Sequence, residues 1–541
     1  MRQCDCQTYN QLRDSSAKLR AQHNLTGAFR LLSKGISIAK QPFHNDLYDA
    51  AALASLTDQF DTAYYYLNSL ADAGEYEMIT CSAANDTDFK SMYADKRWRS
   101  FIWKVNQKKN KEDLRKMASI ASCIDKENKL KHFSDSVLSL AVATPFTGKQ
   151  LWKVLNNYHW YPKIEREDQK ALMSFGVKIN DSTWSFYNVQ LPVNYNPKVS
   201  YPLLLVLHGA VFQNTGFPDP LTLEKYGSSD TTGMNQFFSQ FGYRYQAIVI
   251  YPHANRDFNW MYPDDGFSMV PDIVHDVKRI FNIDDNRVFI SGHSNGATGV
   301  LSYLLKLPDL FGGFYGFNSN PQVRTGGTFI KNAKDRSYFN VATNKDYYFP
   351  ISGHDTLAKI ADSLGIDWQN HIYKGFPHWF PEFKESKEAF QLMFTDMTTR
   401  RRNPFQQRLY WECDDIKYGR CDWIRIDKLD TCAIKQSWQT KINFPVTHWI
   451  NNFDTSKVSD TSIMAFKFPR LSGAVIALHN GNQFHIQTSR VNAITIYLSP
   501  EMIDFTKPVV IYVDGKKVFS KIMPYNKEFI LDAFRNNFDR K

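Results

Sequence analysis

A serine enclosed by two glycines, at the junction of an apolar run and a helical pattern, constrains this chain more than any other feature. Residues 287–291 read Arg-Val-Phe-Ile-Ser, residues 292–296 read Gly-His-Ser-Asn-Gly, and residues 297–307 have helical apolar spacing. A sharp strand-to-helix turn crowds the residues two before and two after the serine, so glycine is needed at both positions. The pattern predicts a tight turn that exposes the Ser294 hydroxyl at the N-terminus of a helix.

The length and composition indicate several globular domains. The chain has 541 residues. Since a typical domain has about 150 residues, this length suggests three or four domains. Hydrophobic residues at 43% and aromatic residues at 15% can fill several cores. The net charge of +10 comes from 65 basic and 55 acidic residues scattered along the chain. The densest basic run, 104–116, is interrupted by Glu112 and Asp113, so we expect no nucleic-acid partner.

The seven cysteines include no C-x-x-C pair, so the sequence predicts no metal site. Cys413, Cys421 and Cys432 lie close enough in sequence to hold one disulfide, which would indicate an oxidising compartment. Three reduced thiols are equally compatible with this spacing.

No run of 18 apolar residues exists, so we expect no transmembrane segment. Residues 1–4 begin no apolar signal segment, so either the protein is cytoplasmic or the numbering starts after a removed signal. We expect a periplasmic or secreted protein, with a cytoplasmic one as the alternative.

Residues 1–110 predict helices that repeat at an offset of 35 residues. Apolar residues recur at Leu12 and Leu47, Ala17 and Ala52, Ala28 and Ala63, Phe29 and Tyr64, and Leu32 and Leu67. Such recurrence is expected when one helical hairpin packs on the next. The segment resembles a tetratricopeptide repeat, although Asp58 stands where that family usually has glycine. The region could bind a protein partner, and packing or dimerisation is an equally good interpretation.

The spacing of apolar residues changes after residue 170, from a helical pattern to one typical of strands. Residues 111–170 continue the helical pattern as a linker, and a hairpin follows around residues 172–191. Continuous apolar runs at 203–207, 245–251, 287–291, 313–317 and 338–342 alternate with helical patterns. This alternation predicts a doubly wound, mostly parallel sheet over residues 171–400.

Residues 401–541 predict a C-terminal antiparallel β-sandwich. Strand patterns flank an Asn-Gly turn at 480–481 and an Asp-Gly turn at 514–515, the two-residue turns that hairpins prefer. Four tryptophans, Trp411, Trp423, Trp438 and Trp449, lie in this part. They could bind carbohydrate, but we favour packing in the core or between domains.

The order of motifs in residues 171–395 resembles the α/β-hydrolase fold. A His-Gly pair at 208–209 ends one strand, the serine motif follows about 85 residues later, and an aspartate and a late histidine complete the order. Residues 292–297, 307–311 and 376–381 look like the feruloyl esterase and polyhydroxybutyrate depolymerase-like branch. The resemblance implies a serine esterase that needs no cofactor and acts through an acyl-enzyme.

Carried onto this sequence, the resemblance assigns a catalytic triad. Ser294 is the nucleophile, and His378, in the loop after the last strand, is the base. Asp346 follows the strand at 338–342 and would orient the histidine, with Asp355 in reserve. The resemblance also implies that the backbone N–H groups of Asn295 and Ala210 hold the oxyanion.

Other residues near these motifs have two interpretations each. His208 and His293 flank the glycines and are expected to pack and hydrogen-bond rather than catalyse. The loop at 253–262 follows a strand, where parallel sheets bind ligands, so Phe258, Trp260 and Tyr262 could stack on an aromatic acyl group or a sugar. Equally, these aromatic rings could hold the loop in place.

We therefore expect a hydrolase of carboxylic esters, acting on small molecules or on acyl or feruloyl groups of a plant polysaccharide. A serine peptidase of the prolyl oligopeptidase kind shares the same motifs, but no N-terminal propeller repeat is visible. A non-catalytic scaffold that binds a partner through its helical repeats is the third hypothesis. The right residue type at every triad position argues against the scaffold.

Overall fold

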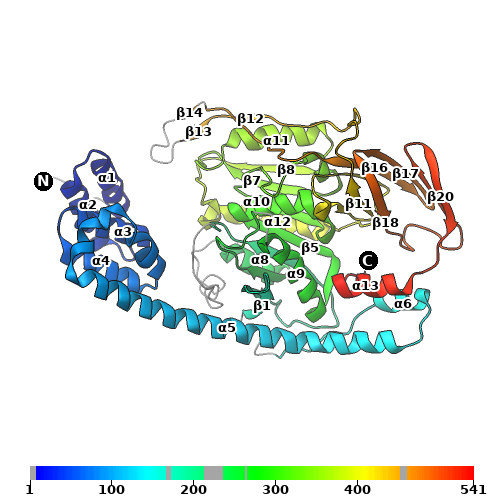
Figure 1. The fold of residues 1–541 in the computed structure, drawn as a ribbon, viewed down its shortest axis with the longest axis horizontal. Coiled ribbons are helices and arrows are strands. Elements are labelled where there is room, and N and C mark those ends of the chain that lie inside the picture. The colour runs from blue at the N-terminus through cyan, green and yellow to red at the C-terminus, as the bar shows by residue number, and fades with distance from the viewer. Residues whose placement is uncertain are drawn as a thin grey trace. The chain divides into compact units, whose positions relative to one another are not determined.

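The computed structural model describes residues 8–165, 172–211, 235–261, 265–450, 458–459 and 461–540. The chain divides into two compact units, one with residues 1–119 and the other with most of residues 120–541. The boundary falls within the long helix α5 (Lys96–Ala143) (Figure 1). The predicted domain boundaries at residues 110, 170 and 400 stay predictions.

The first unit consists of two similar helical hairpins and the segments that follow them. Its elements are α1 (Tyr9–Ala21), α2 (Leu25–Ile38), α3 (His44–Leu56), α4 (Phe60–Asp72), the π-helical turn Met78–Ala83, the 3-10 helix Thr87–Ala94 and the start of α5. Both helices of the second hairpin begin 35 residues after their counterparts in the first. His23 and Asp58, the equivalent turn residues, both have positive φ, at 58° and 57°. The predicted 35-residue repeat is therefore visible in the backbone.

Small side chains bring the helices of the first unit close together. Four alanines of α3, Ala50, Ala51, Ala52 and Ala54, are fully buried, and Ala28 of α2 and Ala63 of α4 are buried too. Alanine combines the highest helix propensity with the smallest side chain that still buries apolar surface. The helical interpretation of this region is confirmed.

An eight-stranded sheet forms the centre of the second unit. Its strands are β1 (Met173–Lys178), β2 (Trp184–Gln190), β3 (Tyr201–Leu207), β4 (Ile248–Pro252), β5 (Ile283–His293), β6 (Gly313–Phe317), β7 (Tyr338–Thr343) and β8 (Trp368–Tyr373). The order across the sheet is β1-β2-β4-β3-β5-β6-β7-β8. The pairs from β4 to β8 are parallel, whereas β1 and β2 pair antiparallel with their neighbours. The predicted mostly parallel sheet is confirmed.

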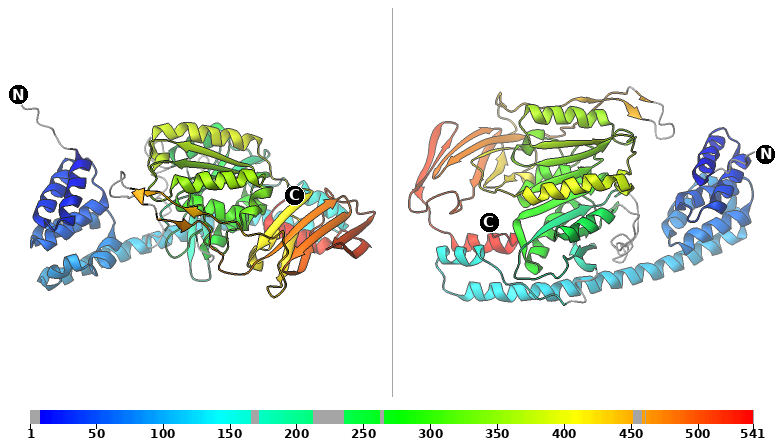
Figure 2. Two further views of the ribbon diagram at one scale, coloured as in Figure 1. Left: turned by 90° about the horizontal axis from the view of Figure 1, so that it is seen from above. Right: turned by 180° about the vertical axis from the view of Figure 1, so that it is seen from behind.

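Helices cover both faces of this sheet (Figures 1 and 2). They are α8 (Gln236–Arg244), α9 (Asp265–Ile280), α10 (Asn295–Lys306), α11 (Ile351–Ser363) and α12 (Lys387–Thr399). Leu203 and Leu205 of β3 enter one core with α9, α10 and α11. Leu204 and Val206 enter the other core, with α8 and α12. Alternate residues of a strand point to opposite faces, so an unbroken apolar run fills two cores.

The C-terminal region contains two sheets that share one core. The larger has the order β20-β19-β17-β16-β9 and the smaller β10-β11-β18. Their strands are β9 (Arg408–Cys413), β10 (Arg420–Cys421), β11 (Ile424–Leu429), β16 (Gly473–Asn480), β17 (Gln483–Ser489), β18 (Val491–Ile496), β19 (Pro508–Val513) and β20 (Lys516–Ile522). Trp411 and Trp423 are buried between the sheets, as the packing interpretation expects.

One pair of strands departs from the predicted antiparallel arrangement. β17 pairs with β19 in parallel. The chain leaves β17 for β18 in the other sheet and returns through residues 497–507, and such a crossover brings a strand back in the same direction. The larger sheet is therefore mixed.

Shorter elements complete the second unit. They are α6 (Gly148–Asn156), α13 (Lys527–Asn537), the 3-10 turns Pro308–Leu310, Ile330–Asp335, Phe380–Glu382, Lys384–Ser386 and Ile416–Tyr418, and the short strands β12 (Pro445–Val446), β13 (Trp449–Ile450), β14 (Val458–Ser459) and β15 (Ile463–Met464). β12 pairs with β15 and β13 with β14. α6 and α13, from distant parts of the chain, share an apolar cluster.

Buried ion pairs connect the central sheet region to the C-terminal sheets. Lys306, at the end of α10, lies 3.1 Å from Asp414, and their side chains are 1% and 0% exposed. Arg336 lies 2.6 Å from Asp422, which is also buried. A buried charge is tolerated only beside its partner, so these pairs tie the two regions together.

The described cysteines Cys81, Cys123, Cys413, Cys421 and Cys432 are all free thiols. Within the described ranges, no group of three or more His, Cys, Asp or Glu side chains could hold a metal ion. Nor does any helix in these ranges combine the length and apolar character required to cross a bilayer.

Candidate active site

Ser294 occupies a strained turn between β5 and α10. Its φ of 57° and ψ of −120° lie in a region that non-glycine residues rarely adopt, at a cost of about 1–3 kcal/mol. The Ser294 N–H donates to the carbonyl of Phe317 at the end of β6, at 3.0 Å. The side chains of Ser294 and Asn295 are partly exposed, whereas Gly292, His293 and Gly296 are buried. The strand-to-helix turn at Ser294 is the one that the sequence predicts, and the role of Ser294 as a nucleophile stays a prediction.

The two glycines of the motif leave no room for a side chain. A Cβ at Gly296 would lie 2.0 Å from the carbonyl oxygen of Leu207 in β3. A Cβ at Gly292 would lie 2.6 Å from the backbone of Gly296. Close backbone approach, rather than positive φ, thus explains both glycines.

Asp346 and His378 form a buried hydrogen-bonded pair. His378 Nδ1 lies 2.7 Å from Asp346 Oδ2, and both side chains are 1% exposed. Asp346 lies in the turn after β7, and its Oδ1 accepts backbone N–H groups from Tyr348 and Phe349 at 2.8 and 3.0 Å. Burial alone would raise the pKa of Asp346, but hydrogen bonds from His378, Asn318 and the backbone hold it below its ordinary value. Asp346 is therefore a carboxylate that can orient the ring and stabilise its protonated form.

The turn that carries Ser294 contacts the loop of His378 through His293, the residue before the serine. No hydrogen bond within the described part of the chain joins the Ser294 hydroxyl to His378. The ring of His293, the residue before the serine, has its centroid 4.7 Å from that of His378. A hydrogen bond between a catalytic serine and its histidine base often forms or tightens only when substrate binds.

Two polar residues that the sequence analysis missed hold the Asp346 turn. Asn318, directly after β6, donates from Nδ2 to Asp346 Oδ2 at 2.9 Å and contacts Thr343 Oγ1 at 2.6 Å. The Thr343 hydroxyl in turn donates to the carbonyl of Pro377, next to His378, at 3.1 Å. These bonds link the ends of β6, β7 and β8. No local sequence motif identifies Asn318 or Thr343. Their position at the ends of predicted strands is the one sequence feature that could have indicated them.

His293 and His208 have structural hydrogen bonds. His293 Nε2 donates to the backbone carbonyl of His378 at 2.7 Å. Burial, helped by the neighbouring His378, lowers the pKa of His293 to about 3, so its ring is neutral. His208 Nε2 accepts the N–H of Ala254 at 3.0 Å, which places its proton on Nδ1, toward the carbonyl of Gly209 at 2.7 Å. Both histidines have the packing and hydrogen-bonding contacts expected of them.

The backbone around Ala210 lies beside the start of α10. A Cβ at Gly209 would lie 3.0 Å from the Cβ of Ser294. The N–H of Val211 donates to Asn295 Oδ1 at 3.3 Å, so this side chain fixes the turn. Ala210 is exposed and has a φ of 53°. Its predicted role, and that of the Asn295 N–H, in holding an oxyanion stay predictions.

The predicted aromatic loop is largely buried. Phe258 is 4% exposed and Trp260 is fully buried, with its ring against Gly299 of α10. Tyr262 lies outside the described residues. Burial of this degree fits the alternative in which the aromatic rings hold the loop in place, and substrate contact by Phe258 and Trp260 stays a prediction.

Other aromatic side chains are exposed beside His378. Tyr348 and Trp379 are 46% and 38% exposed. Their ring centroids lie 4.8 and 5.1 Å from that of His378, and the two rings meet each other edge to face. Tyr348 and Trp379 are sequence neighbours of Asp346 and His378. That closeness in sequence could have indicated them as candidate site residues. A planar group bound near His378 would contact these two rings.

No protein-family model matches the chain, and no curated protein matches it. Solved structures with partial likeness include a thermostable esterase, with a TM-score of 0.34 and 19% identity over 43% of this chain and 64% of that one. Esterase 2 of Thermogutta terrifontis has a TM-score of 0.34 and 9% identity over 43% and 93% of the two chains. S-formylglutathione hydrolase of Staphylococcus aureus has a TM-score of 0.32 and 15% identity over 41% and 98%. The match thus spans less than two thirds of the thermostable esterase.

Proposed function

We propose that the chain is a serine hydrolase that cleaves carboxylic esters through an acyl-enzyme. The observation that carries the proposal is the buried 2.7 Å pair of His378 and Asp346. Ser294 lies in a strained, partly exposed turn, and the residue before it, His293, bonds to the backbone of His378. An exposed serine alone is a weak nucleophile. A neutral imidazole whose other nitrogen is held by a carboxylate can accept its proton.

The reaction uses each group in turn. Ser294 Oγ attacks the ester carbonyl carbon while His378 Nε2 takes its proton. The N–H groups of Asn295 and Ala210 stabilise the resulting oxyanion. The carbon–oxygen bond to the alcohol then breaks, and His378 gives its proton to the departing oxygen. Water repeats the same steps on the acyl-enzyme and releases the acid and free Ser294.

The proposed substrates are esters that carry a planar aromatic group or a sugar, such as feruloyl esters of plant polysaccharides. Tyr348 and Trp379 support this class because both rings are exposed and lie within about 5 Å of the His378 ring. Aromatic rings bind planar and sugar groups by stacking. A serine peptidase, which would use the same three groups on an amide, is the alternative.

The proposal is tested with the full chain and three substrates: p-nitrophenyl acetate, methyl ferulate and a dipeptide anilide. Ser294→Ala is expected to reduce ester turnover by about a thousandfold or more. Ser302→Ala is the matched control, because its hydroxyl donates to the carbonyl of Thr298 within the same helix. It should keep wild-type activity.

The thermal unfolding temperature of Ser294→Ala should match that of the wild type, so that lost activity cannot be ascribed to lost fold. Full ester turnover by Ser294→Ala would overturn the assignment of the nucleophile. Cleavage of the anilide alone would replace the esterase proposal with the peptidase.

A further inference from the structure

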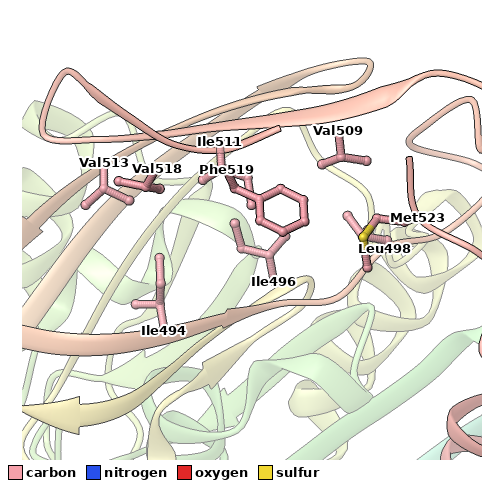
Figure 3. A pocket seen from close by; sticks show the side chains of 9 residues that line it. All are labelled: Ile494, Ile496, Leu498, Val509, Ile511, Val513, Val518, Phe519 and Met523. Atoms are coloured by element: carbon pink, nitrogen blue, oxygen red, sulfur yellow. The ribbon is translucent and has the colours of Figure 1, made fainter. Parts of the chain in front are cut away.

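An apolar cavity separates the two C-terminal sheets along one side. It has a volume of about 230 Å³ and lies between β18 and the β19–β20 hairpin. Nine side chains line it, and all are apolar. Figure 3 shows Ile496 facing Phe519 across the gap, with Leu498 and Met523 gathered at one end and Val513 at the other. A polar ligand would find no hydrogen-bonding side chain in this lining.

The cavity opens between two sheet edges. β18 is an edge strand of the smaller sheet, and β20 is an edge strand of the larger. Val518, which lines the cavity, is 59% exposed, so solvent reaches the cavity at this side. Apolar walls that stay open to water favour an apolar ligand, because binding removes them from water.

A β-bulge in β20 adds one more apolar side chain to the cavity lining. Ile511 pairs with Phe519 but Tyr512 pairs with Lys517, so Val518 is an extra residue in the ladder. At a bulge, two consecutive side chains can face the same side of a sheet. Both Val518 and Phe519 accordingly line the cavity.

Two lysines stand on the cavity face of the same strand. Val509 pairs with Lys521 and Val513 with Lys516, and residues directly opposite each other share a face. Since both valines line the cavity, Lys516 and Lys521 mark its two ends. Both lysines are exposed, and neither forms an ion pair with a described residue. An apolar wall between cationic groups is complementary to an amphiphilic anion.

We propose that this cavity binds the free anion of a medium-chain aliphatic carboxylic acid. The hydrocarbon chain lies between Ile496 and Phe519, and the carboxylate contacts Lys516 or Lys521. This site is separate from Ser294, and the proposal does not depend on the esterase activity.

Binding is measured by isothermal titration of the full chain with decanoate, kept below the concentration at which it forms micelles. We expect saturable binding to the wild type and equal binding to Ser294→Ala. Ile496→Trp, which fills the cavity, should abolish it. The double variant Lys516→Gln and Lys521→Gln should weaken binding about tenfold through loss of the charged contacts.

Lys517→Gln is the matched control. Lys517 pairs with Tyr512, whose ring stacks on His485 at 4.7 Å, and Tyr512 does not line the cavity. This variant changes the same charge on the same strand but on the opposite face, so it should bind decanoate like the wild type.

Each contrary outcome overturns the proposal. No binding to the wild type, or full binding to Ile496→Trp, would exclude the cavity as the site. Equal loss with Lys517→Gln would show general attraction to surface charge. Co-sedimentation with phosphatidylglycerol vesicles without decanoate binding would assign the surface to a membrane instead.

Discussion

His293 Nε2 donates a hydrogen bond to the backbone carbonyl of His378, at 2.7 Å. The residue that precedes the proposed nucleophile therefore holds the loop that carries the proposed base. Ser294 and His378 lie 84 positions apart in the sequence, and this bond fixes the turn and the loop relative to each other. Loss of the bond should alter the geometry of catalysis more than substrate affinity.

His293→Phe is expected to lower kcat about tenfold or more with little change in KM, since the phenyl ring fills the space but donates no hydrogen bond. His293→Gln, whose amide can donate in the same direction, should recover part of the loss. Steady-state kinetics on p-nitrophenyl acetate measures both. A change confined to KM would show that His293 does not position His378.

The buried neutral state of His293 should also appear in the pH dependence of stability. Its pKa falls from an ordinary 6.5 to about 3 in the folded chain, so the unfolded chain binds a proton that the folded chain does not. Its contribution is present above pH 6.5 and is lost as pH falls toward 3. The free energy of unfolding in urea should therefore decline less for His293→Phe than for the wild type between about pH 7 and pH 4. Parallel curves would contradict a neutral buried ring.

Asp346→Asn should reduce kcat about ten-thousandfold, because an amide favours the wrong tautomer of His378 and cannot stabilise its positive charge. The control is Asp355→Asn, an exposed residue of α11, which should leave kcat unchanged. Ester hydrolysis at neutral pH measures both. Similar losses in the two variants, or loss only in Asp355→Asn, would move the acid of the triad away from Asp346.

Trp379→Ala should lower kcat/KM for methyl ferulate about tenfold, with about a twofold change at most for p-nitrophenyl acetate. The expected difference arises because the proposal places the feruloyl ring against the Trp379 and Tyr348 rings, and the acetyl group has no ring to place there. Trp184→Ala is a control of similar exposure, 39% against 38%, and should affect neither substrate. Equal loss on both substrates would assign Trp379 to the shape of the site rather than to specificity.

Asp414→Asn should destabilise the chain by about 3–5 kcal/mol, because it leaves the buried Lys306 without its counter-charge. Burial already lowers the pKa of Lys306, and Asp414 offsets part of that effect. Asp532→Asn removes a carboxylate from the exposed pair with Arg535 and should cost less than about 1 kcal/mol. Urea unfolding measures both variants. A small effect at Asp414 would show that the two regions do not depend on this ion pair.

Features encoded over a few consecutive residues could be predicted from the sequence. The strand, turn and helix around Ser294 follow from the spacing of Gly292 and Gly296, and the Asp514–Gly515 hairpin follows from its turn residues, with φ of 49° and 79°. Asp346 and His378 were predicted from their place after apolar runs, and the structure brings them into hydrogen-bond contact. Their catalytic roles stay predictions.

Contacts between distant segments could not be predicted in this way. Asn318 meets Asp346 only because β6 and β7 are neighbours in the sheet. The burial of Trp260 against α10 and the exposure of Trp379 likewise depend on how segments distant in sequence pack. The sequence by itself determined the local backbone and the order of the chemical groups, because steric crowding and side-chain alternation act between near neighbours. Only the tertiary structure decided which groups touch, which are buried and where a cavity opens, because strand order and packing depend on the whole chain.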